Sequence, residues 1–207
     1  MPFDEIKRII DQYPRGIVVN LQGEGEPTQH PDFEAIVRYV YDSGKLPFII
    51  TNGSRINASF IRKCFKSIGF SIDTLDDVES NKIGRFGLKY VLSALDSVKD
   101  IATVYTVDYG QNIEPLRQYL KAKAIPHIIQ KANTKSDYPT HKEIQEYHYN
   151  CQYINNRQLD YYNINSKLMP CCYIKDESKY ISIDDIKEKL KNRQVPDCCV
   201  GCRQISH

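Results

Sequence analysis

Amphipathic helices and short apolar strands alternate through the first 130 residues, and this alternation most constrains the fold. Ile6, Ile9 and Ile10 recur at helical spacing, and GIVVNLQ (16–22) then has the composition of a buried strand. Four more helix-then-strand units follow, with predicted helices over 31–44, 58–69, 84–100 and 112–125 and predicted strands over 46–51, 70–73, 101–107 and 126–130. This pattern predicts an α/β fold in which helices cover a parallel sheet. A doubly wound open sheet and an open or partial barrel both satisfy it.

Charge and hydropathy exclude several classes of partner. Lys plus Arg number 28 and Asp plus Glu 26, so the formal charge of +2 gives no electrostatic basis for binding nucleic acid or an anionic membrane. No apolar run approaches the roughly 20 residues that a membrane helix requires. The N-terminal MPFDEIKRII carries acids early and lacks the apolar core of a signal peptide, so we expect a cytoplasmic protein.

The regular alternation stops after Gln130, which predicts a change of domain. The polarity and cysteine content of the remaining residues suggest three parts: an α/β domain over 1–130, a connecting segment over 131–150 and a cysteine-rich segment over 151–207. The chain contains no internal repeat and no low-complexity tract.

Local signals within the cysteine-rich segment predict a small α+β structure. LDYYNI (159–164) and PCCYIKD (170–176) are predicted as short strands, and SIDDIKEKL (182–190) is predicted as a helix. Ser182, with Asp185 three residues later, is the predicted N-cap of that helix.

Polar residues follow each predicted strand of the α/β domain. The first strand leads into GEGEPTQHP (23–31), in which glycines allow close backbone approach and Glu24 and Glu26 offer carboxylates to an ammonium or hydroxyl group. The later strands end in polar groups as well: Asn52, Ser71, Asp73, Asp108, Asn112 and Gln130. Because ligands gather at the carboxyl ends of parallel strands, we predict a shared ligand site there. The alternative is a set of tight turns with solvated acids.

Six of the seven cysteines lie in the C-terminal segment, and Cys64 stands alone. The six are Cys151, Cys171, Cys172, Cys198, Cys199 and Cys202. The terminal Cys-x-x-Cys pair lets two sulfurs face one metal, and remote cysteines can complete a tetrahedral sulfur site. We predict four ligands: Cys151, one member of the 171/172 pair, Cys199 and Cys202. Spacing leaves zinc and an iron–sulfur cluster equally open, and six unrelated buried thiols are the alternative.

Together these motifs resemble the radical S-adenosylmethionine (radical SAM) enzymes that carry a C-terminal SPASM or twitch auxiliary-cluster segment. The resemblance covers about residues 3–203 and rests on GEGEP (23–27), FIITNG (48–53), the strand and helix from Ile68 to Val98, LMPCC (168–172) and CCVGC (198–202). It implies a partial (β/α)6 barrel that lacks its first strand, followed by a small cysteine-rich α+β segment.

The resemblance also implies cofactors and site residues. Gly25, Glu26 and Pro27 occupy the motif that meets the methionyl amino group of S-adenosylmethionine. The cavity walls would include Asn52, Ser71, Asp73 and Asn112. The C-terminal cysteines would hold an auxiliary [4Fe–4S] cluster, with zinc as the alternative.

One departure from the family pattern leaves two hypotheses for the function of the chain. The Cys-x3-Cys-x2-Cys loop that holds the catalytic cluster occurs nowhere in the sequence, so this chain alone is not expected to perform radical chemistry. One hypothesis is that the chain is the body of an enzyme that cleaves S-adenosylmethionine reductively to modify a peptide or small metabolite. The other is a degenerate, non-catalytic metal-binding protein whose barrel remnant binds a partner or peptide. A missing first strand would expose a sheet edge suited to self-association.

Overall fold

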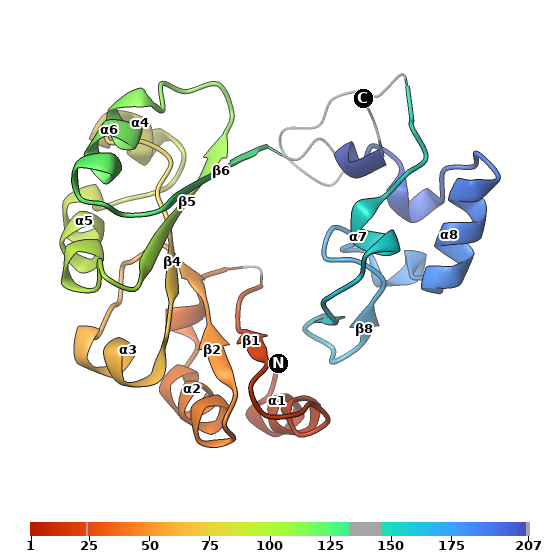
Figure 1. The fold of residues 1–207 in the computed structure, drawn as a ribbon, viewed down its shortest axis with the longest axis horizontal. Helices are drawn as coiled ribbons and strands as arrows, with labels where there is room; N and C mark the ends of the chain where they lie inside the picture. Colours follow the sequence, from red (N-terminus) through yellow and green to blue (C-terminus); the bar gives the residue numbers. More distant parts are fainter. Residues whose placement is uncertain (24, 133–145, 206–207) are drawn as a thin grey trace. The chain divides into compact units, whose positions relative to one another are not determined.

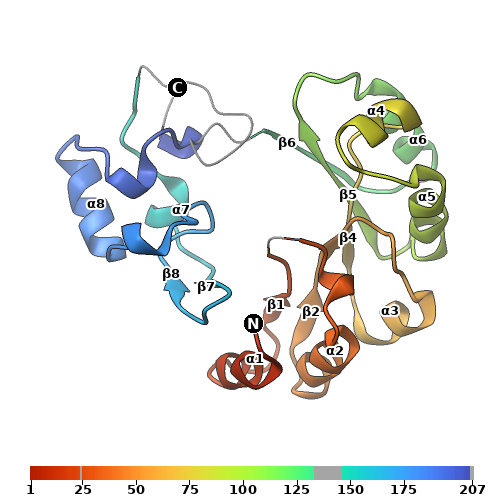
Figure 2. The same ribbon diagram turned by 180° about the vertical axis from the view of Figure 1, so that it is seen from behind.

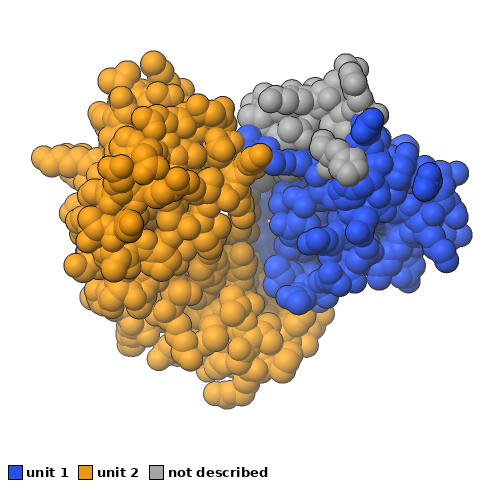
Figure 3. Space-filling model, turned by 45° about the horizontal axis from the view of Figure 1, so that its top comes forward, with its two compact units in different colours: residues 1, 132–207 blue, residues 2–131 orange. Residues whose placement is uncertain are grey.

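The computed structural model describes residues 1–23, 25–132 and 146–205. The chain divides into two compact units, which Figure 3 distinguishes by colour. Residues 2–131 form one unit, called here the sheet unit, and residue 1 with residues 132–207 forms the other, called the cysteine unit. Within the described part of the chain, no helix is both long and apolar enough to cross a membrane.

The sheet unit alternates helices with short strands, as the sequence predicts. Its helices are α1 (Phe3–Ile10), the 3-10 helix η1 (Pro27–Gln29), α2 (Phe33–Asp42), α3 (Ala58–Cys64), α4 (Asp77–Lys82), α5 (Leu88–Ser97) and α6 (Glu114–Ala122). Its strands are β1 (Val18–Asn20), β2 (Leu46–Phe48), β3 (Ile50–Thr51), β4 (Ile68–Ser71), β5 (Ala102–Asp108) and β6 (His127–Lys131).

All strand pairings in this unit are parallel, and they follow the order of the chain. Only Ile49 separates β2 from β3, and its carbonyl accepts a hydrogen bond from the Gly69 amide at 2.8 Å. The segment 46–51 therefore pairs with β1 through its first half and with β4 through its second half. Sequential parallel strands are the winding of a barrel, whereas a doubly wound sheet reverses its strand order. The structure thus decides between the two architectures that the sequence left open.

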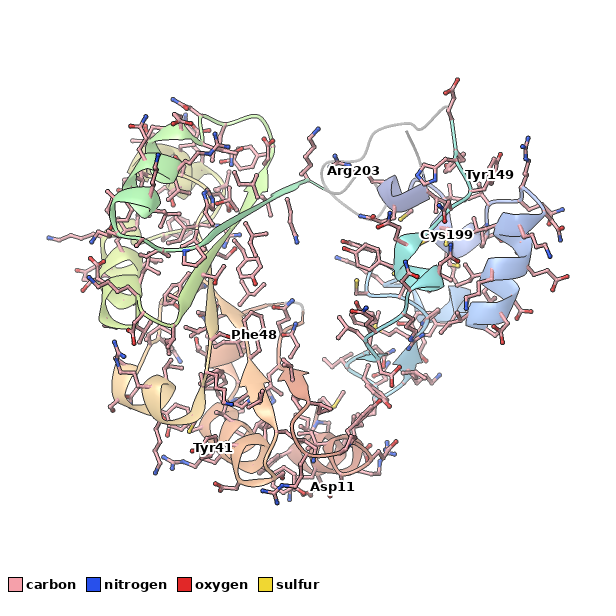
Figure 4. The ribbon with its side chains drawn as sticks, in the orientation of Figure 1. Asp11, Tyr41, Phe48, Tyr149, Cys199 and Arg203 are labelled. Atoms are coloured by element: carbon pink, nitrogen blue, oxygen red, sulfur yellow. The ribbon has the colours of Figure 1, made fainter. Side chains whose placement is uncertain are left out.

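The helices lie along one face of this curved sheet, as Figures 1 and 2 show from opposite sides. Inward-facing apolar side chains of the helices and alternate strand positions form the core between these layers. Fully buried members include Val37, Ile61, Phe70, Leu95, Val104 and Leu116. On the other face of the sheet, Phe48, which is labelled in Figure 4, packs edge-on against Tyr105 with ring centroids 6.4 Å apart. Helices on one face only are the expected arrangement for the wall of a partial barrel.

Some predicted boundaries in the sheet unit are wrong, and one helix was not predicted. The helix predicted over 58–69 ends at Cys64, and β4 begins at Ile68, two residues before the predicted strand over 70–73. The helix predicted over 84–100 begins at Leu88, because Gly84 and Gly87 both have positive φ and cannot continue a helix. The sequence analysis also missed the short helix α4. The Asp76 carboxylate caps that helix by accepting a hydrogen bond from the Glu79 amide at 3.0 Å.

The cysteine unit consists of short elements around a small core. They are α7 (Gln152–Asn155), the antiparallel strands β7 (Tyr161–Tyr162) and β8 (Leu168–Met169), η2 (Glu177–Lys179), α8 (Ile183–Lys191), η3 (Asp197–Cys199) and η4 (Arg203–Ile205). The side chain of Ser182 accepts a hydrogen bond from the Asp185 amide at 3.0 Å, which confirms the predicted cap of α8. The strand predicted over 159–164 contains β7.

The strand predicted over 170–176 is wrong. The chain turns there, and the Ile174 amide donates to the Cys171 carbonyl at 3.1 Å. A turn of this kind reverses the direction of the chain over residues 171–174, so the backbone is not extended and cannot pair with a neighbouring strand. The apolar residues that suggested a strand are instead buried in the core of the unit, with Ile174 only 3% exposed.

Candidate cofactor site and cysteine cavity

The loop after β1 carries Glu26 to the carboxyl end of β3. Gly25 has a φ of 100°, a left-handed conformation that favours glycine and turns the chain into η1. Pro27 is the first residue of η1, and Glu26 caps it by accepting a hydrogen bond from the Thr28 amide at 3.1 Å. The Gly-Glu-Pro sequence therefore forms a compact turn that fixes the direction of the Glu26 side chain.

The Glu26 carboxylate bonds to the end of β3 as well as to its own turn. Its Oε1 accepts hydrogen bonds from the Thr28 hydroxyl at 2.7 Å and the Thr51 hydroxyl at 2.6 Å. Its Oε2 accepts from the Asn52 amide at 2.6 Å. These bonds join two loops that lie 26 residues apart in the sequence, so two of the predicted site residues, Glu26 and Asn52, are in direct contact.

A second carboxylate lies at the ends of β4 and β5. Asp73 is only 3% exposed, and it accepts hydrogen bonds from the Val107 amide at 2.7 Å and from Arg85 Nε at 2.5 Å. Gln111 donates to the Asp73 carbonyl at 3.1 Å. Ser71, the last residue of β4, is half-buried two positions earlier. Asp73 is therefore engaged with protein groups on three segments.

The other predicted site residues have local roles. The Asn52 side chain accepts from the Ser54 amide at 2.9 Å. Asn112 is exposed, and its side chain accepts from the Glu114 amide at 3.2 Å at the start of α6. Glu24 lies outside the described residues. The sequence analysis did not single out the Thr28 and Thr51 hydroxyls, because threonine at a strand end or turn carries no specific signal.

Five of the six C-terminal cysteines line one cavity in the cysteine unit. They are Cys151, Cys171, Cys198, Cys199 and Cys202, each between 3% and 8% exposed, and Figure 4 labels Cys199 among them. Apolar side chains such as Ile154, Ile174 and Ile205 complete the lining, together with Tyr173 and Gln204. Cys172 is half-buried, is not part of this lining, and hydrogen-bonds with Tyr161. In residues 1–23, 25–132 and 146–205, no three His, Cys, Asp or Glu side chains are already arranged to hold a metal ion.

The surroundings of these thiols shift their pKa values in different directions. Burial raises the pKa of the Cys151 thiol. The neighbouring Cys198 sulfur, 3.8 Å away, and burial together raise the pKa of Cys199. Hydrogen bonds from Cys171 and Tyr161 lower the pKa of Cys172. A cavity lined by several thiols and few other polar groups suits a thiolate-ligated metal or cluster, whose binding would release the protons.

A comparison with protein families decides how this geometry is classified. Residues 1–122 match the family model described as "Radical SAM superfamily". The chain belongs to the radical SAM superfamily. This assignment covers the turn with Glu26, the end of β3 and the Asp73 network, and it confirms the resemblance to radical SAM enzymes. The matched residues end before the cysteine unit, so the SPASM or twitch assignment of that unit stays a prediction. Membership in the superfamily implies S-adenosylmethionine and an iron–sulfur cluster as cofactors.

Two curated relatives share the name "S-adenosylmethionine-dependent nucleotide dehydratase". The relative from Psychrobacter lutiphocae is 29% identical over 126 residues, and the relative from Selenomonas ruminantium is 32% identical over 106 residues. These alignments cover 59% and 47% of this chain. They cover 40% and 38% of the relatives, so the chain matches about two fifths of their length.

Solved structures of radical SAM enzymes share the fold. Streptococcus suis SuiB bound to the precursor peptide SuiA matches with a TM-score of 0.58 at 16% identity. The superposed region covers 76% of this chain and 40% of the SuiB chain. Native anSMEcpe with bound AdoMet also matches with a TM-score of 0.58, at 14% identity. That match covers 91% of this chain and 69% of the anSMEcpe chain. At such identities the similarity establishes the fold, which confirms the predicted radical SAM type of partial barrel.

Proposed function

We propose that the sheet unit binds S-adenosylmethionine at the carboxyl ends of its strands, with Glu26 receiving the methionyl ammonium group. The observation that carries this proposal is the docked Glu26 carboxylate, which is held by uncharged donors from Thr28, Thr51 and Asn52. Glu26 is half-buried and has no cationic partner among the described residues, and such a carboxylate suits a cationic ligand. Gly25 and Pro27 set the turn, and Asn52, Ser71, Asp73 and Asn112 are the proposed surroundings of the cofactor and substrate.

We also propose that the cysteine cavity holds an auxiliary [4Fe–4S] cluster. Thiols are its main polar lining, and soft thiolate ligands select iron–sulfur clusters or zinc. The lining favours Cys171 over Cys172 as the ligand from that pair. The other proposed ligands are Cys151, Cys202 and Cys199, with Cys198 as the competitor of Cys199. Such a cluster supplies electron transfer or substrate contact when bound. The proposed location is cytoplasmic, where a reducing environment keeps clustered cysteines available as metal ligands.

The proposed activity of the whole protein is reductive cleavage of S-adenosylmethionine to modify a peptide or small metabolite. The two curated relatives carry nucleotide dehydratase in their names, which supports a small-molecule substrate. The structure of SuiB with its precursor peptide supports a peptide. Self-association through β1 is also part of the proposal, because β1 pairs with β2 alone among the described strands and its Val18 is 56% exposed.

Calorimetric titration of the purified chain with S-adenosylmethionine tests the cofactor site. Glu26→Gln keeps the size of the side chain and removes its charge, and we expect it to weaken binding at least about tenfold. Glu34→Gln is the matched control, because Glu34 lies exposed on α2 and pairs with Arg38. Equal affinities in the Glu26→Gln variant and the unmodified chain would contradict the proposed site.

Metal analysis after anaerobic purification tests the cysteine cavity. We expect about four iron and four sulfide per chain. The double variant Cys199→Ala, Cys202→Ala should contain neither iron nor sulfide. The variant Cys64→Ala, which removes a buried thiol of the sheet unit, should retain both. About one zinc without sulfide would overturn the cluster assignment. That result would favour the non-catalytic alternative, in which the unit is a structural clamp.

A further inference from the structure

Thr51 holds its hydroxyl group in a buried position beside the Glu26 carboxylate. The residue ends β3 and is 1% exposed. Its Oγ1 accepts a hydrogen bond from the Gly53 amide at 3.0 Å and lies 2.6 Å from Glu26 Oε1. Because the amide supplies its own hydrogen to Oγ1, the hydroxyl hydrogen of Thr51 is available for the carboxylate. The direction of the bond from Thr51 to Glu26 is therefore determined by local geometry.

The two oxygens of Glu26 differ in how many donors they already accept. Oε1 accepts three hydrogen bonds, from the Thr28 amide, the Thr28 hydroxyl and the Thr51 hydroxyl. Oε2 accepts one among the described residues, from the Asn52 amide. An ionised carboxylate offers about two lone-pair sites on each oxygen, so the three donors more than fill those of Oε1, whereas Oε2 retains a site.

We propose that Thr51 is a positioning residue that holds Oε1 so that Oε2 faces the ammonium group of the cofactor. This inference rests on the proposed function, because it adds to the same site a group that acts through Glu26. Without the Thr51 hydroxyl, Oε1 keeps only its bonds to Thr28 within its own turn, and the carboxylate turns more easily about its last torsion, which has a broad energy well. The ammonium group then meets a less fixed acceptor. Thr51 itself is enclosed by protein and has no part in contacting the ligand.

The test compares Thr51→Val, which keeps the shape of the side chain, with Thr51→Ser, which keeps the hydroxyl. We expect Thr51→Val to weaken S-adenosylmethionine binding roughly tenfold in a calorimetric titration and Thr51→Ser to restore affinity to within about twofold. Binding of an analogue that lacks the α-amino group should change less than about twofold in both variants. A merely structural role would weaken both ligands alike.

Thr106→Val is the matched control for loss of a buried hydroxyl. Thr106 is also 1% exposed, and its hydroxyl donates to the Ile72 carbonyl at 2.5 Å, not to Glu26. We expect this variant to bind S-adenosylmethionine like the unmodified chain. If thermal unfolding shows that Thr51→Val is not folded at the titration temperature, Thr51→Ala removes the same hydroxyl with a smaller side chain.

The outcomes separate this inference from the function on which it rests. If Glu26→Gln binds S-adenosylmethionine weakly but the Thr51 variants without the hydroxyl bind it as the unmodified chain does, the inference about Thr51 is wrong and the proposed cofactor site stands. An equal loss of affinity for both ligands in those variants also overturns the inference about Thr51. Unchanged binding by Glu26→Gln overturns the proposed cofactor site itself.

Discussion

At the scale of single residues, the two carboxylates at the strand ends have opposite surroundings. Glu26 is half-buried and bonds only to uncharged donors in the described part of the chain. Asp73 is buried and already paired with the Arg85 guanidinium, whose side chain is 32% exposed. A buried charge that loses its partner is costly, so we expect Asp73 to contribute to the stability of the sheet unit.

Asp73→Asn tests this structural role. The amide oxygen can still accept from Val107, but the amide nitrogen then opposes the Arg85 Nε donor. We expect unfolding of the sheet unit in urea to lose about 2–3 kcal/mol. Asp100→Asn, which breaks the exposed pair with Arg62, should cause little change. An Asp73→Asn variant as stable as the unmodified chain would contradict the assignment.

At the scale of elements, β5 and β6 are linked by a pH-sensitive contact as well as by their backbone ladder. The Thr106 hydroxyl donates to the Ile72 carbonyl, so it accepts from His127 Nε2 at 2.8 Å. Burial, with a smaller contribution from Arg117, lowers the pKa of His127 below its usual value. The folded protein therefore favours the neutral imidazole with its proton on Nε2.

This contact predicts a loss of stability in mild acid. The unfolded chain binds a proton on His127 at a pKa of about 6.5, above the lowered pKa in the folded protein. The contribution of His127 is thus fully present above about pH 6.5 and is lost as the pH falls through the folded pKa. We expect His127→Gln to flatten the dependence of the unfolding midpoint on pH between about 7 and 5. Parallel curves for the two proteins would show that His127 does not cause the dependence.

The N-cap of α8 gives a second test at this scale. Ser182→Ala leaves the Asp185 amide without its side-chain acceptor, and we expect the cysteine unit to lose about 1 kcal/mol of stability. Ser182→Asp retains an acceptor at the same position and should lose much less. Hydrogen exchange of the first turn of α8 would report the difference, and equal exchange in both variants would refute the role of the cap.

At the scale of the whole molecule, the described residues form two separate hydrophobic cores. One lies between the sheet and its helices, and the other contains the five cavity cysteines together with residues such as Ile154, Ile186 and Leu190. A small core surrounding several buried thiols gains most from a bound metal or cluster, because the ligand binds the folded unit and not the unfolded one.

Metal loading should therefore stabilise the two units unequally. We expect reconstitution with iron and sulfide to slow amide hydrogen exchange in residues 146–205 by at least about tenfold and to leave residues 2–131 nearly unchanged. The Cys199→Ala, Cys202→Ala double variant should show no such protection, and Cys64→Ala should show all of it. Equal protection of both units would contradict a cluster confined to the cysteine cavity.

The sequence alone was sufficient to predict the alternation of helices and strands in the sheet unit apart from α4, the radical SAM family and the Ser182 cap. These follow from local periodicity and from short motifs such as Gly25-Glu26-Pro27, which depend on neighbouring residues. Helix boundaries were predicted less well where Gly84 and Gly87 break the pattern, because apolar spacing continues across a turn.

Only the tertiary structure decided which strands pair, and hence that the sheet winds as a barrel. It also decided which of two adjacent thiols lines the cavity and which hydroxyl holds Glu26. Thr51 and Cys172 illustrate the physical reason. A threonine at a strand end and a second cysteine in a pair have no local signature, and their environments are created by segments distant in the sequence, namely those that carry Glu26 and Tyr161.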